Sequence, residues 1–234
     1  MIAVIAHRGE HLHHPENTLP AYEAAIRAGA DYVEVDVRTT VDGKLVVMHD
    51  ATVDSRTNGS GRVKDMTLGQ ILKLDAGIRS GEAFRGVPPP SFEEVLVWVR
   101  GRCGVYVDLK DVAPKALTAA LERHGMVDRS VIYGGEELLR QLPGLRVMPE
   151  AMNAPTARRL VQELRPRVIA FDARDFTDDA IAVAREAGAA IYVDRFGPAD
   201  NEGAWQNAID RGATGIQTDK PAELAEYLKG KGYR

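Results

Sequence analysis

Short apolar runs alternate with amphipathic stretches along the whole chain. Eight runs have the length and the Val and Ile content of buried strands. They are Ile2–Ala6, Tyr32–Asp36, Val105–Lys110, Ser130–Tyr133, Arg146–Pro149, Val168–Phe171, Ala190–Val193 and Gly215–Thr218. The intervening segments have helical spacing of apolar residues and often end before a glycine or a proline. The predicted helices are Thr18–Ala28, Ser91–Arg100, Ala113–His124, Thr156–Leu164, Thr177–Ala187, Asn201–Arg211 and Ala222–Lys229.

This alternation of strand and helix predicts an α/β fold with parallel strands joined by crossover helices. Eight repeats fill the 234 residues without a spare domain. The count favours a closed (β/α)8 TIM barrel over an open doubly wound sheet. A doubly wound sheet usually has a glycine-rich loop after its first strand, whereas this first strand leads into His7-Arg8-Gly9. We therefore expect residues 1–234 to form a single barrel domain.

One further strand and one long segment do not fit the repeat. Lys44–Met48 follows the turn signal Asp42-Gly43 and is predicted to be an added strand. The segment at about 50–90, Asp50–Pro90, is rich in Gly, Ser, Asp and Pro and contains one predicted helix, Leu68–Leu74. We interpret it as a small insertion after the second strand that stands over the barrel mouth and shapes substrate access. The alternative is a surface loop without a role in the site.

Composition and charge exclude several classes of function. The net charge of -4 and the isoelectric point near 5.9 leave no basic surface for nucleic acid. No apolar run approaches the ~20 residues needed to span a bilayer, and no basic amphipathic stretch suggests membrane insertion. A single cysteine, Cys103, allows no internal disulfide. Without a signal-peptide pattern, a cytoplasmic location is expected; the sequence indicates no oligomeric state.

Acidic residues with strand spacing gather where the predicted strands end. Glu34 and Asp36 are two residues apart, so both can point into the mouth and share one cation. Asp108 and Lys110 repeat this spacing on the next barrel strand. Carboxylate oxygens suit Mg²⁺, Ca²⁺ or Mn²⁺ rather than Zn²⁺. The alternative of equal weight is an ion-pair network that closes the top of the barrel.

Two histidines and an arginine complete the set of candidate residues. His7 and His49 follow two neighbouring apolar runs and can exchange protons near neutral pH. Arg8 can bind a phosphate through two parallel hydrogen bonds. Together with the carboxylates, these residues indicate metal-assisted chemistry on a phosphoryl group. The nearby cluster of His11, His13 and His14 lacks zinc-site spacing and is predicted to be a solvated loop.

The ordered motifs resemble the glycerophosphodiester phosphodiesterase family over nearly the whole chain. They are HRG, PENT, EVDV, MHD, RTNGSG, LDAG, PSFEEVL, YVDLK and GIQTDKP. The resemblance implies a TIM barrel and hydrolysis of a small glycerophosphodiester to glycerol 3-phosphate and an alcohol, with Mg²⁺ or Ca²⁺ expected.

Residue by residue, the resemblance assigns His7 and His49 to the acid–base pair. It makes Arg8 and Lys110 substrate-binding residues, and Glu34, Asp36 and Asp108 metal ligands. Asp108 stands where the family usually has a glutamate. Many family members have a run similar to Trp-Thr-Val-Asn where this chain has Val193–Gly197. This difference concerns the preferred alcohol rather than the reaction.

Two other functions fit the same residues. One is a related phosphodiesterase or a phospholipase D-like lyase acting on another phosphodiester, which only product analysis would distinguish. The other is a non-catalytic barrel that binds phosphorylated ligands. A binding protein would not need both histidines beside the metal ligands, so the sequence favours an enzyme.

Overall fold

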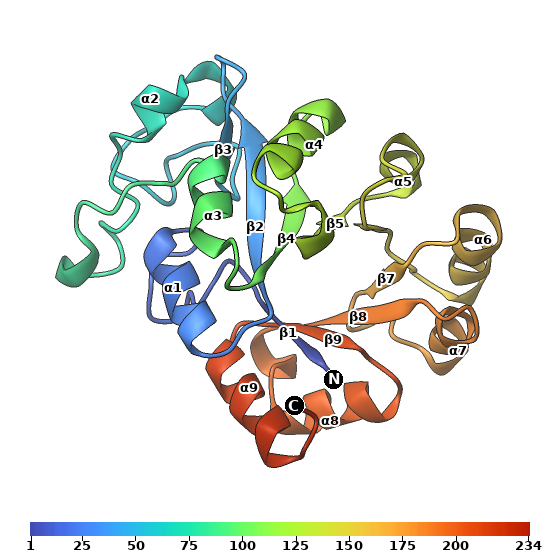
Figure 1. Cartoon of the computed structure of the whole chain (residues 1–234). Coiled ribbons are helices and arrows are strands. Elements are labelled where there is room, and N and C mark those ends of the chain that lie inside the picture. The colour runs from blue at the N-terminus through green and yellow to red at the C-terminus, as the bar shows by residue number, and fades with distance from the viewer.

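Eight parallel strands close into a barrel in the computed structural model, which describes all 234 residues (Figure 1). The barrel strands are β1 (Ala3–Ala6), β2 (Tyr32–Thr39), β4 (Gly104–Leu109), β5 (Ser130–Tyr133), β6 (Val147–Met148), β7 (Val168–Phe171), β8 (Ala190–Arg195) and β9 (Gly215–Thr218). The first strand pairs with both β2 and β9. Between β6 and β7, Ala170 exchanges backbone hydrogen bonds of 2.9 Å with Pro149 and Ala151. The predicted TIM barrel is confirmed.

Helices surround the barrel and follow the strands in the predicted order. They are α1 (Leu19–Arg27), α3 (Phe92–Val99), α4 (Pro114–Arg123), α5 (Glu136–Gln141), α6 (Ala154–Leu164), α7 (Asp178–Glu186), α8 (Glu202–Asp210) and α9 (Pro221–Gly230). The sequence pattern did not predict α5, because six residues are too few to establish a helical period. None of the helices combines the length and hydropathy needed to cross a bilayer.

Strand β2 extends three residues beyond its predicted end at Asp36. The extension pairs antiparallel with the added strand β3 (Leu45–Val47), with Thr39 opposite Leu45 and Val37 opposite Val47. The predicted end rested on the polar residues there, but the ladder with β3 keeps this backbone hydrogen-bonded. As a result, β3 returns the chain toward the mouth of the barrel.

Alternation along the strands separates two apolar cores. The larger core lies between the strands and the helices and includes Val4, Val33 and Val35. The smaller one fills the barrel, with Ile5, Tyr106, Val131, Met148, Val168, Ala170 and Tyr192. Side chains two positions beyond an inward-facing residue also face inward. Successive strands therefore direct His7, Asp108 and other polar residues into the mouth above the inner core.

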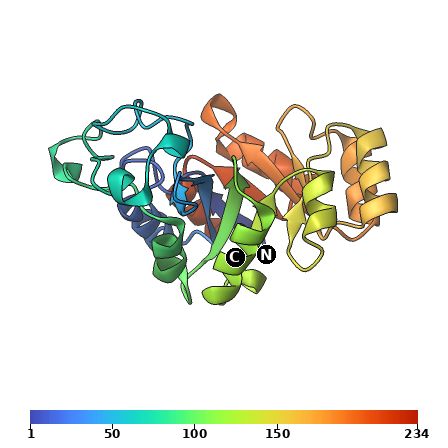
Figure 2. The same ribbon diagram turned by 90° about the horizontal axis from the view of Figure 1, so that it is seen from above.

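The segment between β3 and α3 has a small core of its own. Val46, Met48, Val53, Val63 and Ile71 are buried together there. Its one α-helix, α2 (Leu68–Ile71), is shorter than predicted and begins with a capping box formed by Thr67 and Gln70. Two 3-10 turns, Val63–Asp65 and Glu82–Phe84, also occur in this segment. Figure 2 shows it on the opposite side of the molecule from α6 and α7.

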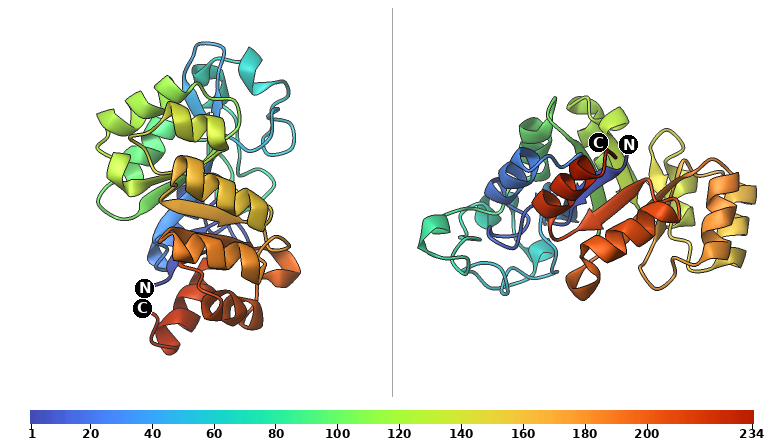
Figure 3. Two further views of the ribbon diagram at one scale, coloured as in Figure 1. Left: turned by 90° about the vertical axis from the view of Figure 1, so that its right-hand side faces the viewer. Right: turned by 90° about the horizontal axis from the view of Figure 1, so that it is seen from below.

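The two ends of the chain lie close together beneath the barrel (Figure 3). Arg234 bonds the backbone carbonyl of Gly29 at 2.7 Å and the carboxylate of Asp31 at 2.9 Å. Asp31 in turn accepts a hydrogen bond from the backbone N–H of Val4 in β1. The C-terminus is thereby tied to the amino-terminal ends of the first strands, away from the mouth.

Candidate active site

His7 follows β1 and is held by contacts from the other end of the chain. Its Nδ1 lies 2.8 Å from Oδ1 of Asp219, just after β9, and its ring stacks on Phe196 at 4.3 Å between centroids. Burial lowers the pKa of His7, an effect that the hydrogen bond to Asp219 only partly offsets. The ring is therefore predominantly neutral at pH 7, with Asp219 fixing its orientation.

Arg8 is bound through both its backbone and its side chain. It has a positive φ of 52°, and its N–H donates to Oε2 of Glu34 at 2.7 Å. The guanidinium lies 3.2 Å from Glu16 and 3.5 Å from Asp36. Gly9 must follow, because a Cβ there would lie 2.8 Å from the backbone of Ala21. The tight turn thus places the Arg8 side chain beside the carboxylates.

Glu34, Asp36 and Asp108 converge as the spacing predicted. One oxygen from each carboxylate lies within 4.8 Å of the others. Burial and the charges of Asp36 and Asp108 raise the pKa of Glu34 well above its usual value. Glu34 and Asp36 are almost fully buried. Three hard oxygen donors in one place, with mutual repulsion to offset, fit a divalent cation.

Lys110 bridges two of these carboxylates. Its Nζ lies 2.7 Å from Asp108 and 3.0 Å from Asp36. Burial alone would lower the pKa of Lys110, but the hydrogen bond to Asp108 and the charge of Asp36 raise it. Lys110 is therefore a permanent cation beside the carboxylate cluster, where an incoming phosphate would meet it.

Asn17, the third residue of the PENT motif, contacts the carboxylate cluster. It has a positive φ of 57°, and its Nδ2 donates to Oδ2 of Asp36 at 2.7 Å. Its own Oδ1 accepts from the hydroxyl of Tyr22 at 2.9 Å. Asn17 therefore orients Asp36; the signal that could have identified it is an asparagine directly before the predicted helix.

His49 follows the added strand β3 by two residues. The preceding residue, Met48, donates its N–H to the carbonyl of Asp36 at 2.9 Å, which fixes this segment beside the carboxylates. Nδ1 of His49 lies 2.8 Å from Oδ1 of Asp50, whose pKa is lowered by hydrogen bonds from Ser55 and His49. The His49 side chain is 35% exposed, compared with 19% for His7.

The predicted solvated loop is exposed only in part, since His11 and His14 are both half-buried. His13 is a surface residue, but His11 is half-buried, with Nδ1 2.8 Å from the carbonyl of His7. Nε2 of His11 also lies 3.5 Å from Asp219. His7, His11 and Asp219 form a second group of converging ligand atoms. The loop folds back onto β1 because the turn at Arg8 and Gly9 reverses the chain, which residue spacing alone does not reveal.

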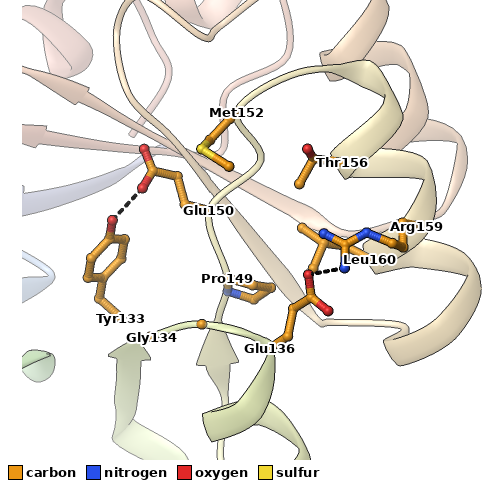
Figure 4. A pocket seen from close by; sticks show the side chains of 10 residues that line it. Tyr133, Gly134, Glu136, Pro149, Glu150, Met152, Thr156, Arg159 and Leu160 are labelled. Carbon is orange, nitrogen blue, oxygen red and sulfur yellow. Dashed lines mark hydrogen bonds and ion pairs between the residues drawn. The ribbon is translucent and has the colours of Figure 1, made fainter.

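A pocket of about 260 Å³ lies beside the mouth, between the ends of β5 and β6 and the helix α6. Figure 4 shows Tyr133 directed at Glu150 on one side of the pocket, and Glu136 paired with Arg159 on the other. None of the predicted catalytic or metal-binding residues lines it. A second pocket of about 370 Å³ does reach the site, since Arg8 and His11 line it together with Arg56 and Arg79 from the insertion.

Comparison with known proteins agrees with this arrangement. The sequence model of the glycerophosphoryl diester phosphodiesterase family matches residues 7–131. A glycerophosphodiester phosphodiesterase of Bacillus subtilis is 30% identical over 98% of this chain and 87% of its own length. Another, from Caldanaerobacter subterraneus subsp. tengcongensis, is 56% identical over 40% of this chain, a stretch that spans only 38% of that relative.

The same likeness holds in three dimensions. A crystal structure of a glycerophosphodiester phosphodiesterase from Agrobacterium tumefaciens superimposes with a TM-score of 0.88 and 31% identity. That comparison covers 97% of this chain and 100% of the other. The chain therefore belongs to the glycerophosphodiester phosphodiesterase family. The predicted enzyme class, a phosphodiesterase of glycerophosphodiesters, is confirmed at the level of the family.

Proposed function

We propose that this chain hydrolyses small glycerophosphodiesters to glycerol 3-phosphate and an alcohol, with a divalent cation held by Glu34, Asp36 and Asp108. The observation that carries the proposal is the convergence of these three carboxylates within 4.8 Å, beside Arg8 and Lys110. Family membership supports the reaction, and the geometry supports the roles of the residues.

The donor set supports Mg²⁺ or Ca²⁺, with Mn²⁺ as a further candidate, because all three ligands are hard carboxylate oxygens. When bound, such a cation offsets charge on the phosphate oxygens and lowers the pKa of a coordinated hydroxyl group. Arg8 and Lys110 bind the remaining phosphate oxygens. Asn17 keeps Asp36 in place through its 2.7 Å hydrogen bond.

The two histidines perform the proton transfers. His7 is mostly neutral at pH 7 because burial lowers its pKa, so its free Nε2 accepts the proton of the attacking hydroxyl group. Asp219 holds Nδ1 and thereby leaves Nε2 available. His49, oriented by Asp50, donates a proton to the leaving alcohol oxygen. The attacking group is either water or the neighbouring glycerol hydroxyl.

The direct test measures release of glycerol 3-phosphate from glycerophosphocholine and glycerophosphoethanolamine, with EDTA, Mg²⁺, Ca²⁺ and Mn²⁺ compared in parallel. We expect release that depends on the cation. A cyclic phosphate as the final product would instead establish the lyase. Binding of glycerol 3-phosphate without turnover under any condition would support the non-catalytic barrel.

We propose further that residues 1–234 form one barrel domain with an insertion at about 50–90. A cytoplasmic location is supported by the single cysteine, which allows no internal disulfide. Limited proteolysis that released a stable fragment shorter than the barrel would contradict the first proposal. Recovery of the protein outside the cytoplasmic fraction would contradict the second.

A further inference from the structure

A polar group without a partner lies inside the barrel, on the strand β9 that pairs with β1. Gln217 in β9 is only 6% exposed, and its Oε1 is buried without a hydrogen-bond partner. Its neighbours in register are Ile5 and Asp194. Gly215, two residues earlier, faces the ring of Tyr192 in the inner core, so the Gln217 side chain also points into the barrel. A buried unpaired carbonyl oxygen is costly and indicates a missing donor.

The side of the mouth next to Gln217 is acidic. Asp194, Asp172 and Glu150 follow one another at the ends of β8, β7 and β6. Burial, together with the charges of Asp172 and Glu150, raises the pKa of Asp194 to about 7. The Asp194 carboxylate has no hydrogen bond or ion pair, although its backbone carbonyl accepts one from Arg195. The free protein therefore leaves this carboxylate uncompensated.

Nearby cations do not neutralise these groups. The guanidinium of Arg195 is turned away, against the ring of Phe176 and the carbonyl of Ala204. Asp172 has only Arg174, whose side chain is 80% exposed, at 3.2 Å. Such an exposed pair is weak.

Glu150 accepts a hydrogen bond of 2.5 Å from the hydroxyl of Tyr133 (Figure 4). This contact satisfies one carboxylate oxygen but supplies no positive charge. The acidic side of the mouth thus has no buried cation paired with its carboxyl groups in the free protein.

A bare metal ion does not fit this side of the mouth. Only two groups of three ligand residues bring their atoms within 4.8 Å of one another, and neither includes Asp194, Asp172 or Glu150. The carboxylates are spread around the rim rather than pointed at one position. Together with the Gln217 oxygen they offer several hydrogen-bond acceptors, which suit an organic cation with several N–H donors.

The mouth is therefore polarised across its width. Arg8, Lys110 and the metal-binding carboxylates lie on the β1, β2 and β4 side, and the uncompensated acidic residues lie on the β6 to β8 side. We infer that the preferred substrate carries a primary ammonium group on its alcohol half, as in glycerophosphoethanolamine, and that Gln217 and Asp194 bind this group. The inference rests on the proposed function. A quaternary ammonium group has no N–H to offer these acceptors.

The test compares kcat/KM for three substrates that share the phosphodiester and differ in the alcohol: glycerophosphoethanolamine, glycerophosphocholine and glycerophosphoglycerol. In the unmodified protein, we expect the first to exceed each of the others by roughly tenfold or more, as for a hydrogen bond to a charged group. Gln217→Leu and Asp194→Asn should each reduce this ratio toward one. Asp128→Asn, an exposed change just before β5, is the matched control and should preserve the ratio.

The outcomes separate the two proposals. Turnover of all three substrates with equal kcat/KM would overturn the ammonium inference and leave the proposed function intact. Absence of turnover with every cation would overturn the proposed function and, with it, this inference. Gln217→Leu could lower the melting temperature strongly. In that case, the same kcat/KM ratio is measured for Asp172→Asn, which lies at the rim and leaves the inner core unchanged. A preference that survives all three variants would also contradict the inference.

Discussion

The two histidines proposed to transfer protons occupy contrasting environments. His7 follows a barrel strand, stacks on Phe196 and bonds Asp219, a residue 212 positions away in the sequence. His49 follows an added antiparallel strand and bonds its direct neighbour Asp50. The first is held by the closure of the barrel, and the second by a local contact in a more exposed segment.

This contrast suggests a division of labour. A buried ring with a lowered pKa is in its neutral form at pH 7 and can accept a proton, and its position depends on the whole fold. An exposed ring on a peripheral strand can donate its proton to a leaving group and recover one from solvent. Since Asp219 is supplied by the last strand, changes at the C-terminal end of the chain should reach the chemistry through His7.

Removal of either imidazole should have the largest effect. His7→Ala and His49→Ala should each lower kcat by ~10²–10⁴, the range for general acid–base groups. Steady-state kinetics with glycerophosphoethanolamine would measure this, with His13→Ala as a surface control. Near-normal turnover in either variant would remove that histidine from the mechanism.

Substitution of a proposed metal ligand should have the second-largest effect on activity. Glu34→Gln keeps the shape of the side chain but removes a charge, so half-maximal activation should require ~10-fold or more Mg²⁺ or Ca²⁺. Because the same change relieves repulsion with Asp36 and Asp108, we expect the melting temperature not to fall. An unchanged metal titration would count against the ligand role.

The orienting carboxylates give the sharpest comparison between the two histidines. Asp219→Asn should lower kcat about tenfold and Asp50→Asn only about two- to threefold, both below the effect of removing an acid–base group. Asp50 is more exposed than Asp219, so solvent can replace its contact more easily. Equal effects in the two variants would show that barrel closure gives His7 no special support.

The smallest effect concerns pH. Burial lowers the pKa of His7 from 6.5, so the acid limb of kcat/KM should lie below pH 6.5. The unfolded chain binds more protons at this position than the folded chain does. Stability should therefore rise with pH between the lowered pKa and 6.5, and lose this contribution as pH falls through that window. Activity profiles and melting curves of the protein and of His7→Ala would test both signs.

The local sequence pattern correctly predicted much of the secondary structure. The predicted strands Ser130–Tyr133, Val168–Phe171 and Gly215–Thr218 coincide with observed ones, because each is a short apolar run with polar residues after it. The two-residue spacing of Glu34 and Asp36 correctly placed both on the inner face of β2. The family resemblance indicated the reaction class, which composition and periodicity could not predict.

The missed features depend on contacts between distant segments. His11 was assigned to solvent, but the reversal at Arg8 and Gly9 brings it beside His7. Gln217 is a single polar residue in an apolar run, which gives no sign of a role. Only its burial in the folded protein shows that its side-chain oxygen is unpaired. The same holds for α5, which is too short to show a period of its own.

The sequence by itself determined the barrel, the order of its strands and the residue types at their ends, because these follow from local apolar periodicity. Tertiary structure decided which of those residues act on one another. Closure of the barrel brings β9 beside β1, so that Asp219 reaches His7. It also leaves Asp194 and Gln217 side by side without a partner. Burial and charge compensation are properties of this closed arrangement, since they depend on every neighbour in space.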